Sequence, residues 1–348
     1  MVTISGKTLA GPATYTAAGI SVQGQNIPIT QVVFFQKSRR IPLYVPHGIL
    51  LSNGSLLRGL VKGMTPKAFK FQSDMFGSMT IPASKVRAII YSETPATMLQ
   101  PLSAKAPEII FKNATSLPGT LAWMDSKAIG FQYSGEILPI KLDRLQCLVL
   151  HPGVASTGAK TRTLIRLKNG DLWAADSVDT TASSVNADDR VIPWQAIAAI
   201  WTESKRCIPI TNLPRTIDTS WPSDTDFPPP AFPPAKVYIN QSKNGFLTAH
   251  DQYFESGFAC RPISRITFQT DGSYNIFTGC VAIRGSTPVT IQIIANGKVI
   301  LRRLIYPGKN HWIHQAIPGA KTLVLQTLSG PASLLTPRVI WGDPYLIK

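Results

Sequence analysis

The first 200 residues carry one pattern four times, and this repetition constrains the fold more than any other feature of the sequence. In each copy a short apolar segment is followed by a tight turn, further apolar segments and a Leu-Pro or Ile-Pro pair. The four prolines, Pro28, Pro82, Pro139 and Pro193, stand 54, 57 and 54 residues apart. Units of this length are too short to bury a core alone, so the pattern indicates small repeats stabilised by packing on their neighbours.

Each copy has the local pattern of antiparallel strands. Asn53-Gly54 and Asn169-Gly170 favour the positive φ angles of tight hairpin turns, and Asn113-Ala114 stands at the equivalent place in the third copy. Proline cannot donate to a strand ladder, so its fixed place marks the start or edge of a strand. No segment has a helical period long enough to predict a helix. The pattern predicts four all-β repeats, at residues 1–40, 41–100, 101–155 and 156–207.

The composition changes abruptly after the fourth repeat. Eight prolines stand between residues 208 and 235, in a segment otherwise rich in Thr, Ser and Asp. Such a segment favours extended polyproline conformation. It is predicted to be a linker or a wrapping arm between two domains.

The remaining residues, 236–348, alternate short apolar runs with turns. Asp271-Gly272 and Asn296-Gly297 stand between consecutive runs and are predicted as hairpin turns. About eight strands in about 110 residues, without a helix, are typical of a β-sandwich or jelly roll. The predicted fold class is therefore all-β throughout, with four small barrel-like or bent-sheet repeats before a jelly roll.

Two resemblances refine this prediction. The pattern of apolar strand, Asn-Gly turn, strands and Ile-Pro in residues 1–202 resembles tandem Sm-like β-units, and residues 48–92 match it best. A second resemblance is carried by residues 257–259, 264–268, 271–277, 281–283, 296–298 and 340–346. Through them, residues 236–348 resemble the NPCBM family of carbohydrate-binding modules, which implies a galactose-binding-like jelly roll and glycan binding.

The C-terminal region departs from the NPCBM pattern at two places. Cys260-Arg261 stands where the family often has Thr-His, and Arg284 stands where an acidic residue is common. Both changes introduce cations, and a bound Ca²⁺ needs several oxygen ligands, so no metal site is predicted. Arg261 and Arg284 are instead suited to sulfated or carboxylated sugars, because guanidinium binds such anions bidentately.

Sugar sites combine aromatic faces with a few polar groups. The predicted ligand-binding residues of the jelly roll are His250, Tyr253, Phe254, Arg261, Arg284, His311 and Trp312. Each has a structural alternative, since a loop aromatic such as Trp312 can simply cap the core. Trp341 lies in a strand pattern and is expected inside the core.

The sequence does not predict an enzyme. It contains no nucleophile elbow, and its carboxylates fall mostly in predicted turns, so no catalytic residue, metal or cofactor is expected. The cysteines Cys147, Cys207, Cys260 and Cys280 lack the C-x-x-C spacing of zinc sites. Cys260 and Cys280 could form a disulfide or remain two buried thiols.

The chain is basic, with 35 Lys and Arg against 19 Asp and Glu and a net charge of +16. The excess is spread along the chain, which argues against a dedicated nucleic-acid surface. The first hypothesis is a non-catalytic glycan-binding protein with a β-repeat scaffold. The second is an assembly subunit that self-associates or pairs with other proteins through strand edges, and RNA binding by the Sm-like units ranks third.

Location is predicted from the same features. No run of 18 apolar residues is present, so no membrane-spanning helix is predicted. The first nine residues lack the pattern of a signal peptide, whereas the NPCBM resemblance implies export to the periplasm, the cell surface or the medium.

Overall fold

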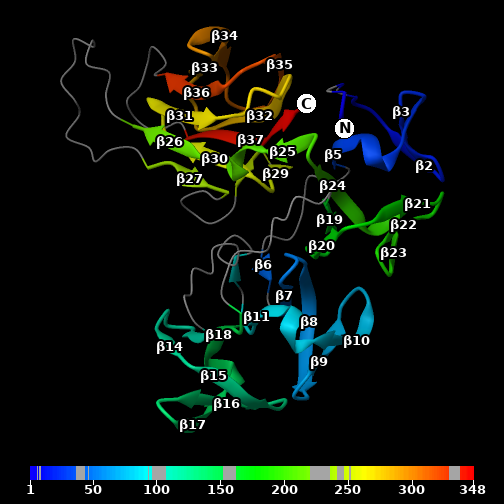
Figure 1. Ribbon diagram of the computed structural model, residues 1–348, viewed down its shortest axis with the longest axis vertical. Coiled ribbons are helices and arrows are strands. Elements are labelled where there is room, and N and C mark those ends of the chain that lie inside the picture. Colours follow the sequence, from blue (N-terminus) through cyan, green and yellow to red (C-terminus); the bar gives the residue numbers. More distant parts are fainter. Residues whose placement is uncertain are drawn as a thin grey trace. The chain divides into compact units, whose positions relative to one another are not determined.

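The structure is a computed structural model of the chain (Figure 1). It describes residues 1–5, 7, 9–36, 44–45, 47–92, 94–95, 107–151, 162–219, 236–240, 247–250, 252–328 and 338–348. These residues form β-strands and short 3-10 helices, which confirms the all-β class. The chain divides into two compact units. Unit 1 comprises residues 1–14, 18–35 and 202–348, and unit 2 comprises residues 15–17 and 36–201.

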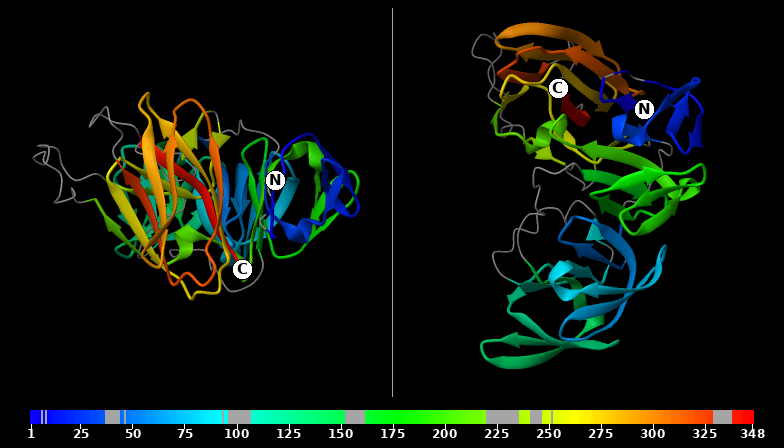
Figure 2. Two further views of the ribbon diagram at one scale, coloured as in Figure 1. Left: turned by 90° about the horizontal axis from the view of Figure 1, so that it is seen from above. Right: turned by 45° about the vertical axis from the view of Figure 1, so that its right-hand side comes forward.

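Unit 1 contains a sandwich of two antiparallel sheets, whose strands can be followed from green to red in Figures 1 and 2. Its strands are β25 (Cys207–Pro209), β26 (Arg215–Asp218), β27 (Tyr238–Ile239), β30 (Gly257–Cys260), β31 (Ser264–Gln269), β32 (Ile276–Arg284), β33 (Val289–Ala295), β34 (Lys298–Ile305), β35 (His311–Ala316), β36 (Thr322–Leu328) and β37 (Arg338–Ile347). One sheet, here called the β37 sheet, has the order β27-β30-β37-β32-β35, with β25 also paired to β37. The other, the β36 sheet, has the order β26-β31-β36-β33-β34.

The sandwich core lies between the two sheets and follows the two-residue period of the strands. In β31, Ile266 and Phe268 are fully buried while Arg265 and Gln269 are exposed. Phe258, Phe277 and Trp341 from the β37 sheet belong to the same apolar cluster, as expected for Trp341. Alternation thus gives each strand of the β36 sheet one face for the core and one for solvent.

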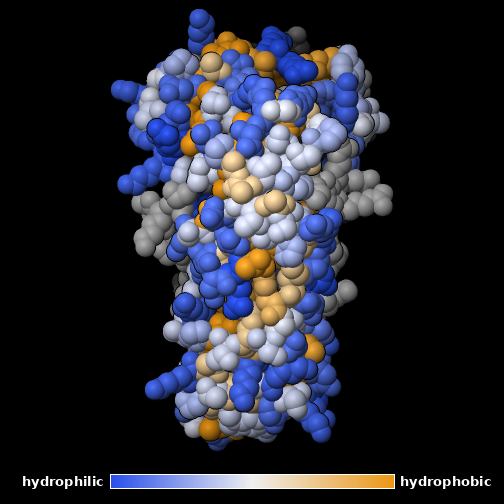
Figure 3. Space-filling view, turned by 90° about the vertical axis from the view of Figure 1, so that its right-hand side faces the viewer, coloured by the Kyte–Doolittle hydropathy of each residue, from blue (hydrophilic) through white to orange (hydrophobic). Residues whose placement is uncertain are grey.

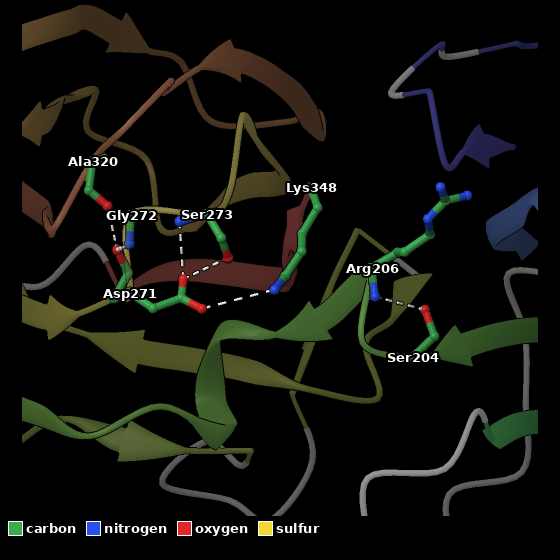
Figure 4. Close-up of polar contacts among 8 residues, drawn as sticks. Ser204, Arg206, Asp271, Gly272, Ser273, Ala320 and Lys348 are labelled. Atoms are coloured by element: carbon green, nitrogen blue, oxygen red, sulfur yellow. Dashed lines mark hydrogen bonds and ion pairs between the residues drawn. The ribbon is translucent and has the colours of Figure 1, made fainter.

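The two predicted Gly turns of the sandwich have different roles. Asn296 and Gly297, with φ angles of 48° and 78°, join β33 to β34 as a two-residue hairpin, as predicted. Asp271-Gly272 instead carries the chain from the β36 sheet to the β37 sheet, so its prediction as a hairpin was wrong. Its carboxylate accepts hydrogen bonds from the N–H (3.0 Å) and Oγ (2.6 Å) of Ser273, and Lys348 Nζ lies 3.7 Å from it (Figure 4). These hydrogen bonds lower the pKa of Asp271.

The predicted linker begins later than residue 208. Residues Cys207–Pro209 pair with the end of β37, and Arg215–Asp218 pair with β31 at the edge of the β36 sheet. Between these strands, Ile210 is fully buried in the sandwich core. The apolar contacts therefore outweigh the local proline signal in this part, and residues 220–235 lie outside the described residues.

Unit 2 contains the second, third and fourth repeats. The second repeat comprises β7 (Gly48–Leu51), β8 (Leu56–Met64), β9 (Ala68–Ser73), β10 (Gly77–Pro82), the 3-10 helix η2 (Ala83–Lys85) and β11 (Val86–Ile90). Its strand order is β11-β7-β8-β9-β10, because the long strand β8 pairs first with β7 and then with β9. At the changeover, Gly59 has a φ of 145°, and a Cβ there would lie 2.0 Å from the carbonyl oxygen of Gln72.

The third and fourth repeats have the same order of elements. The third comprises β13 (Glu108–Phe111), β14 (Ser116–Pro118), β15 (Thr120–Met124), β16 (Ala128–Tyr133), β17 (Glu136–Lys141), η3 (Leu142–Arg144) and β18 (Leu145–Val149). The fourth comprises β19 (Arg162–Leu167), β20 (Leu172–Ala175), β21 (Val178–Thr180), β22 (Ser184–Ala187), β23 (Arg190–Pro193), η4 (Trp194–Ala196) and β24 (Ile197–Glu203). In both, the region equivalent to β8 is divided into two strands.

A 3-10 turn that leads into a buried strand marks the end of each repeat. Pro28, Pro82 and Pro193 stand directly before these turns, and Pro209 stands before a further one at Ile210–Asn212. In the third repeat this position is held by Lys141, so the alignment of Pro139 with the other prolines was wrong by two residues. Lys141 has a φ of −69° and a ψ of 137°, an extended conformation that proline favours and that other residues also adopt.

The tight turns at the start of the repeats are built alike. The side-chain oxygens of Asn53, Asn113 and Asn169 accept hydrogen bonds from the backbone N–H two residues later, at 3.0, 3.1 and 3.0 Å. The residue after each asparagine has a positive φ angle: Gly54 86°, Ala114 64° and Gly170 98°. Ala114 therefore adopts the left-handed conformation that glycine adopts without steric cost.

Replacing this alanine should stabilise the protein. We expect Ala114→Gly to raise the free energy of unfolding by about 1 kcal/mol, because it relieves the Cβ clash of the left-handed region. Chemical denaturation measures the change. Ala128→Gly in strand β16, where Ala128 pairs with Lys141, is the matched control and should lower stability by about 0.5–1 kcal/mol, since glycine weakens a strand. Equal effects of the two substitutions would contradict this account.

Strand pairing joins the repeats of unit 2. β11 pairs with β18, with Ile89 opposite Leu148, and the start of β8 pairs with β20 at Leu56 and Leu172. The second junction contains a buried carboxylate, Asp171, which accepts hydrogen bonds from Arg58 N at 2.7 Å and Asn169 Nδ2 at 3.0 Å. Its pKa is raised, mainly by desolvation.

No helix among the described residues is long and apolar enough to cross a membrane. The face drawn in Figure 3 is mainly hydrophilic, with separate hydrophobic patches among the polar groups.

Candidate ligand-binding face of the sandwich

The outward face of the β37 sheet has an apolar cluster of its own. Ala259, Cys280, Ala282 and Ile340 point to this face from three neighbouring strands. They pack against Leu247, Ala249 and Phe254 of the segment that contains the short hairpin β28 (Thr248–Ala249) and β29 (Gln252–Tyr253). This face is therefore partly covered, unlike the open face of the β36 sheet.

Phe254 belongs to this cover, and its burial does not fit the sugar-stacking role that the sequence predicted for it. Its side chain is 1% exposed, and its ring lies over Gly342, where a Cβ would come within 2.3 Å of a ring carbon. The adjacent loop is held by buried Asp343, whose Oδ1 accepts hydrogen bonds from the N–H groups of Glu255 (2.9 Å) and Ser256 (3.0 Å). The aromatic ring is thus a packing residue over β37.

His311 and Trp312 also have structural contacts. His311, a predicted ligand-binding residue, is 9% exposed, and its Nε2 lies 3.2 Å from the carbonyl oxygen of Tyr306. Desolvation lowers the pKa of His311, and the positive charges of Arg303, Lys309 and His250 lower it further. Trp312 is half-buried, and its ring lies 5.4 Å from that of Phe34 at 32°.

The two other predicted ligand-binding residues of the hairpin are His250 and Tyr253. His250 is exposed at the turn between β28 and β29, with a φ of 47°. The side chain of Tyr253 lies outside the described part of the structure. The described residues contain no group of three His, Cys, Asp or Glu side chains that could hold a metal ion.

Arg261 and Arg284 lie at one end of the β37 sheet, together with a third arginine that the sequence argument missed. Arg284 is directly opposite Arg338 in the pairing of β32 with β37. Arg261 follows Cys260, whose partner in β37 is Val339, so it lies beside Arg338 on the other side. Arg261 and Arg284 are exposed and Arg338 is half-buried. We call these three residues the arginine edge.

Two of the arginines lie on the outward face. Ile283 and Val339, the immediate neighbours of Arg284 and Arg338 in their strands, point into the sandwich core. Because side chains alternate along a strand, Arg284 and Arg338 point to the opposite face, and Arg261 directly follows the end of β30. Arg338 stands after a segment without an apolar pattern, so only the strand register could reveal it.

The carbonyl oxygen of Arg261 is held by two hydroxyl groups. Ser264 Oγ donates to it at 2.7 Å, and Thr327 Oγ1 donates to it at 3.1 Å. Thr327 comes from the neighbouring β36 sheet and is 1% exposed. The backbone at this end of the sheet is therefore fixed by hydrogen bonds, whereas Arg261 itself is exposed.

The four cysteines are buried free thiols. Cys260 points into the sandwich core and Cys280 points to the outward face, so they lie on opposite faces of the β37 sheet and form no disulfide. Burial raises the pKa of all four thiols, to about 12 for Cys147 and Cys260.

These thiols should be unreactive in the folded protein. At pH 8 we expect 5,5′-dithiobis(2-nitrobenzoic acid) to modify fewer than one thiol per chain within the time that all four react in guanidinium chloride, because thiolate is the reacting form. Absorbance at the thionitrobenzoate band counts the thiols. Reaction of only two in the unfolded, unreduced chain would reveal a disulfide and contradict the description above.

Comparison with known proteins gives matches among solved structures only. No family model matches the sequence, and no curated protein matches it. The chain is similar to the CBM51 module from Clostridium perfringens GH95 in complex with methyl-galactose, with 14% identity over 40% of this chain and 99% of that chain and a TM-score of 0.33. It is also similar to CBM51-2 in complex with GlcNAc and the INT domains of Clostridium perfringens ZmpB, with 14% identity, 51% of this chain, 43% of that chain and a TM-score of 0.33.

A third similarity is to CsCBM6-3 from Clostridium stercorarium in complex with cellobiose, with 15% identity over 34% of this chain and 88% of that chain and a TM-score of 0.21. The chain spans less than half of the matched ZmpB chain. At these TM-scores the matches do not assign a fold, and the description of the sandwich rests on its own strand pairing.

Proposed function

We propose that this chain is a non-catalytic glycan-binding protein whose sandwich binds sulfated or carboxylated sugars at the arginine edge. The observation that carries the proposal is the pairing of Arg284 with Arg338 on the outward face, with Arg261 directly after the end of the neighbouring strand β30, on the other side of β37. Neighbouring strands lie about 4.8 Å apart, so the three backbones span about 10 Å. That width accommodates more than one anionic group.

The charge arrangement supports an anionic ligand. Like charges directly opposite each other destabilise a sheet, and Arg284 faces Arg338. Two ion pairs of the described residues, Arg190 with Asp189 and Lys348 with Asp271, do not involve the arginine edge. A sulfate or carboxylate would relieve the repulsion, and guanidinium can bind either through two parallel hydrogen bonds.

The other hypotheses have less support. In unit 2, strand edges already pair with each other within the chain, β11 with β18 and β8 with β20. Self-association through strand edges and RNA binding by the repeats therefore stay predictions from sequence. Export from the cell, which the NPCBM resemblance implies, is proposed with glycan binding.

Removing the arginine edge should selectively weaken anionic ligands. We expect the Arg261→Ala/Arg284→Ala/Arg338→Ala variant of the full chain to lose at least tenfold in affinity for heparin or polygalacturonate, because one lost charged contact of about 1.5 kcal/mol already corresponds to about tenfold. Isothermal titration calorimetry at fixed salt measures this, with dextran as the neutral ligand.

The matched control removes three charges from another strand. Lys298, Arg302 and Arg303 are exposed on β34, and their triple alanine variant should change the affinity by less than threefold. Equal losses in both variants would mean that net charge, and not the arginine edge, binds the polyanion. Retention of full affinity by the arginine-edge variant would refute the proposed site.

A further inference from the structure

The third repeat presents a tryptophan on an open sheet face in unit 2. Strands β15, β16 and β17 form a three-stranded antiparallel sheet. One face is buried and includes Phe131 and Ile129, both 0% exposed. The other face carries Trp123, 39% exposed, and Ile137, 52% exposed. Large exposed apolar groups that gather on one face mark an interaction surface more often than isolated ones do.

A β-bulge turns Trp123 toward this open face. Leu121 pairs with Phe131, whereas Trp123 pairs with Gly130, so Ala122 is an extra residue in β15. Without the bulge, Leu121 and Trp123 would share the buried face, because side chains alternate along a strand. Bulges of this kind commonly re-aim a side chain near a functional site.

The indole ring lies on a glycine. A Cβ added to Gly130 would lie 2.0 Å from Nε1 and 2.3 Å from Cε2 of Trp123. Gly130 does not have a left-handed φ angle, so its backbone conformation does not require glycine. The missing side chain instead leaves room for the ring to rest flat across the sheet, with its other side toward solvent.

The second repeat has the same bulge without the ring. There the strand register shifts between Val61 and Gly63, and Gly63 pairs with Lys70. A Cβ on Gly63 would meet nothing within 4 Å. The repeat architecture therefore does not need an aromatic residue at this place, and the Trp123–Gly130 pair is a separate feature of the third repeat.

The cross-strand row on one side of the ring is uncharged and partly polar. Thr120, Gln132 and Ile137 form the next cross-strand row on the same face, and Thr120 Oγ1 donates to Gln132 Oε1 at 3.5 Å, which leaves the amide NH₂ as a donor. Pro139 continues the row of Trp123 and Gly130. The face thus offers a flat ring, a flat apolar neighbour and uncharged hydrogen-bonding groups on one side, with Asp125 and Lys141 next to Ala128 on the other side.

The size of this surface argues against a protein partner. A tryptophan offers up to about 250 Å², so its exposed part is about 100 Å², and the whole apolar patch is roughly 300 Å². A stable protein interface needs about 800 Å² per partner. One or two sugar rings are of the right size, because the C–H side of a pyranose packs on an aromatic face while its hydroxyl groups bind polar neighbours.

We infer that Trp123, on its Gly130 platform, is a second glycan subsite, which binds a flat, uncharged, β-1,4-linked pyranose chain. A ring with equatorial substituents presents C–H groups on both faces, and an extended chain of such rings suits an open, level sheet face. This subsite stands on its own residues in unit 2 and does not depend on the arginine edge.

The test uses the full chain and cellohexaose as the probe, with binding measured by calorimetry. We expect wild-type binding in the millimolar range or tighter, and a loss of at least tenfold in Trp123→Ala. Gly130→Ala keeps the indole but displaces it, and should lose at least fivefold. Trp123→Tyr should retain part of the affinity, because a flat ring is restored.

Two controls separate this subsite from other causes. Tyr133 is 41% exposed on the same small sheet, and Tyr133→Ala should change the affinity by less than twofold. The arginine-edge variant should bind cellohexaose as the wild type does, so the two proposals fail independently. Circular dichroism and the thermal midpoint of each variant report whether it is folded.

Three results would overturn the inference. The first is the absence of wild-type binding to cellohexaose at 10 mM, and the second is unchanged binding by folded Trp123→Ala. The third is a concentration-dependent dimer in sedimentation that Trp123→Ala abolishes, which would assign the face to self-association.

Discussion

The sandwich depends on its last strand. β37 has ten residues, of which nine are buried, and it pairs with β30, β32 and β25. It contributes Trp341 and Leu346 to the core between the sheets and Ile340 to the outward cluster. A strand with partners on both sides and apolar contacts on both faces has one register, because a shift by one residue would exchange the two faces.

That register has consequences beyond the core. Arg338 is the first residue of β37, and its position between β30 and β32 brings Arg261 and Arg284 to either side of it. The three residues lie more than 20 positions apart in the sequence, yet the buried part of β37 fixes their spacing. A similar relation holds in the third repeat, where the one-residue bulge between Leu121 and Trp123 turns Trp123 away from the buried face.

The sequence predicts elements well where a local rule decides. The Asn turns, the Asn296-Gly297 hairpin and the two-residue alternation of β31 follow from local backbone preferences, and they appear in the structure. Prediction fails where tertiary packing decides. Asp271-Gly272 has a turn sequence, but only the sheet assignment of its flanking strands shows that it crosses between sheets. In the third repeat, Lys141 holds the position that proline holds before the other 3-10 turns, and Pro139 lies two residues earlier. The residue before the turn must be extended, but it does not have to be proline.

The same distinction applies to the candidate site. Composition and family resemblance led to seven predicted ligand-binding residues. Of these, Phe254 is buried, and His311 contacts the backbone of Tyr306. Aromatic residues near a predicted loop could not be sorted into packing and ligand-facing groups, because that depends on what covers them. Arg338 and Trp123 have no local signal at all. Their significance comes from a cross-strand neighbour, an opposing arginine in one case and a glycine in the other.

The two proposed surfaces differ in the physics by which they would hold a sugar. The arginine edge acts through charge, so its attraction extends over about a Debye length and weakens as salt increases. The Trp123 platform acts through apolar contact and neutral hydrogen bonds, which salt screens little. Binding of an anionic glycan at the arginine edge should therefore depend strongly on salt, whereas binding of a neutral glycan at Trp123 should not. An all-β scaffold suits this task, because each sheet face presents side chains in flat rows at fixed spacing while the opposite face provides the stability.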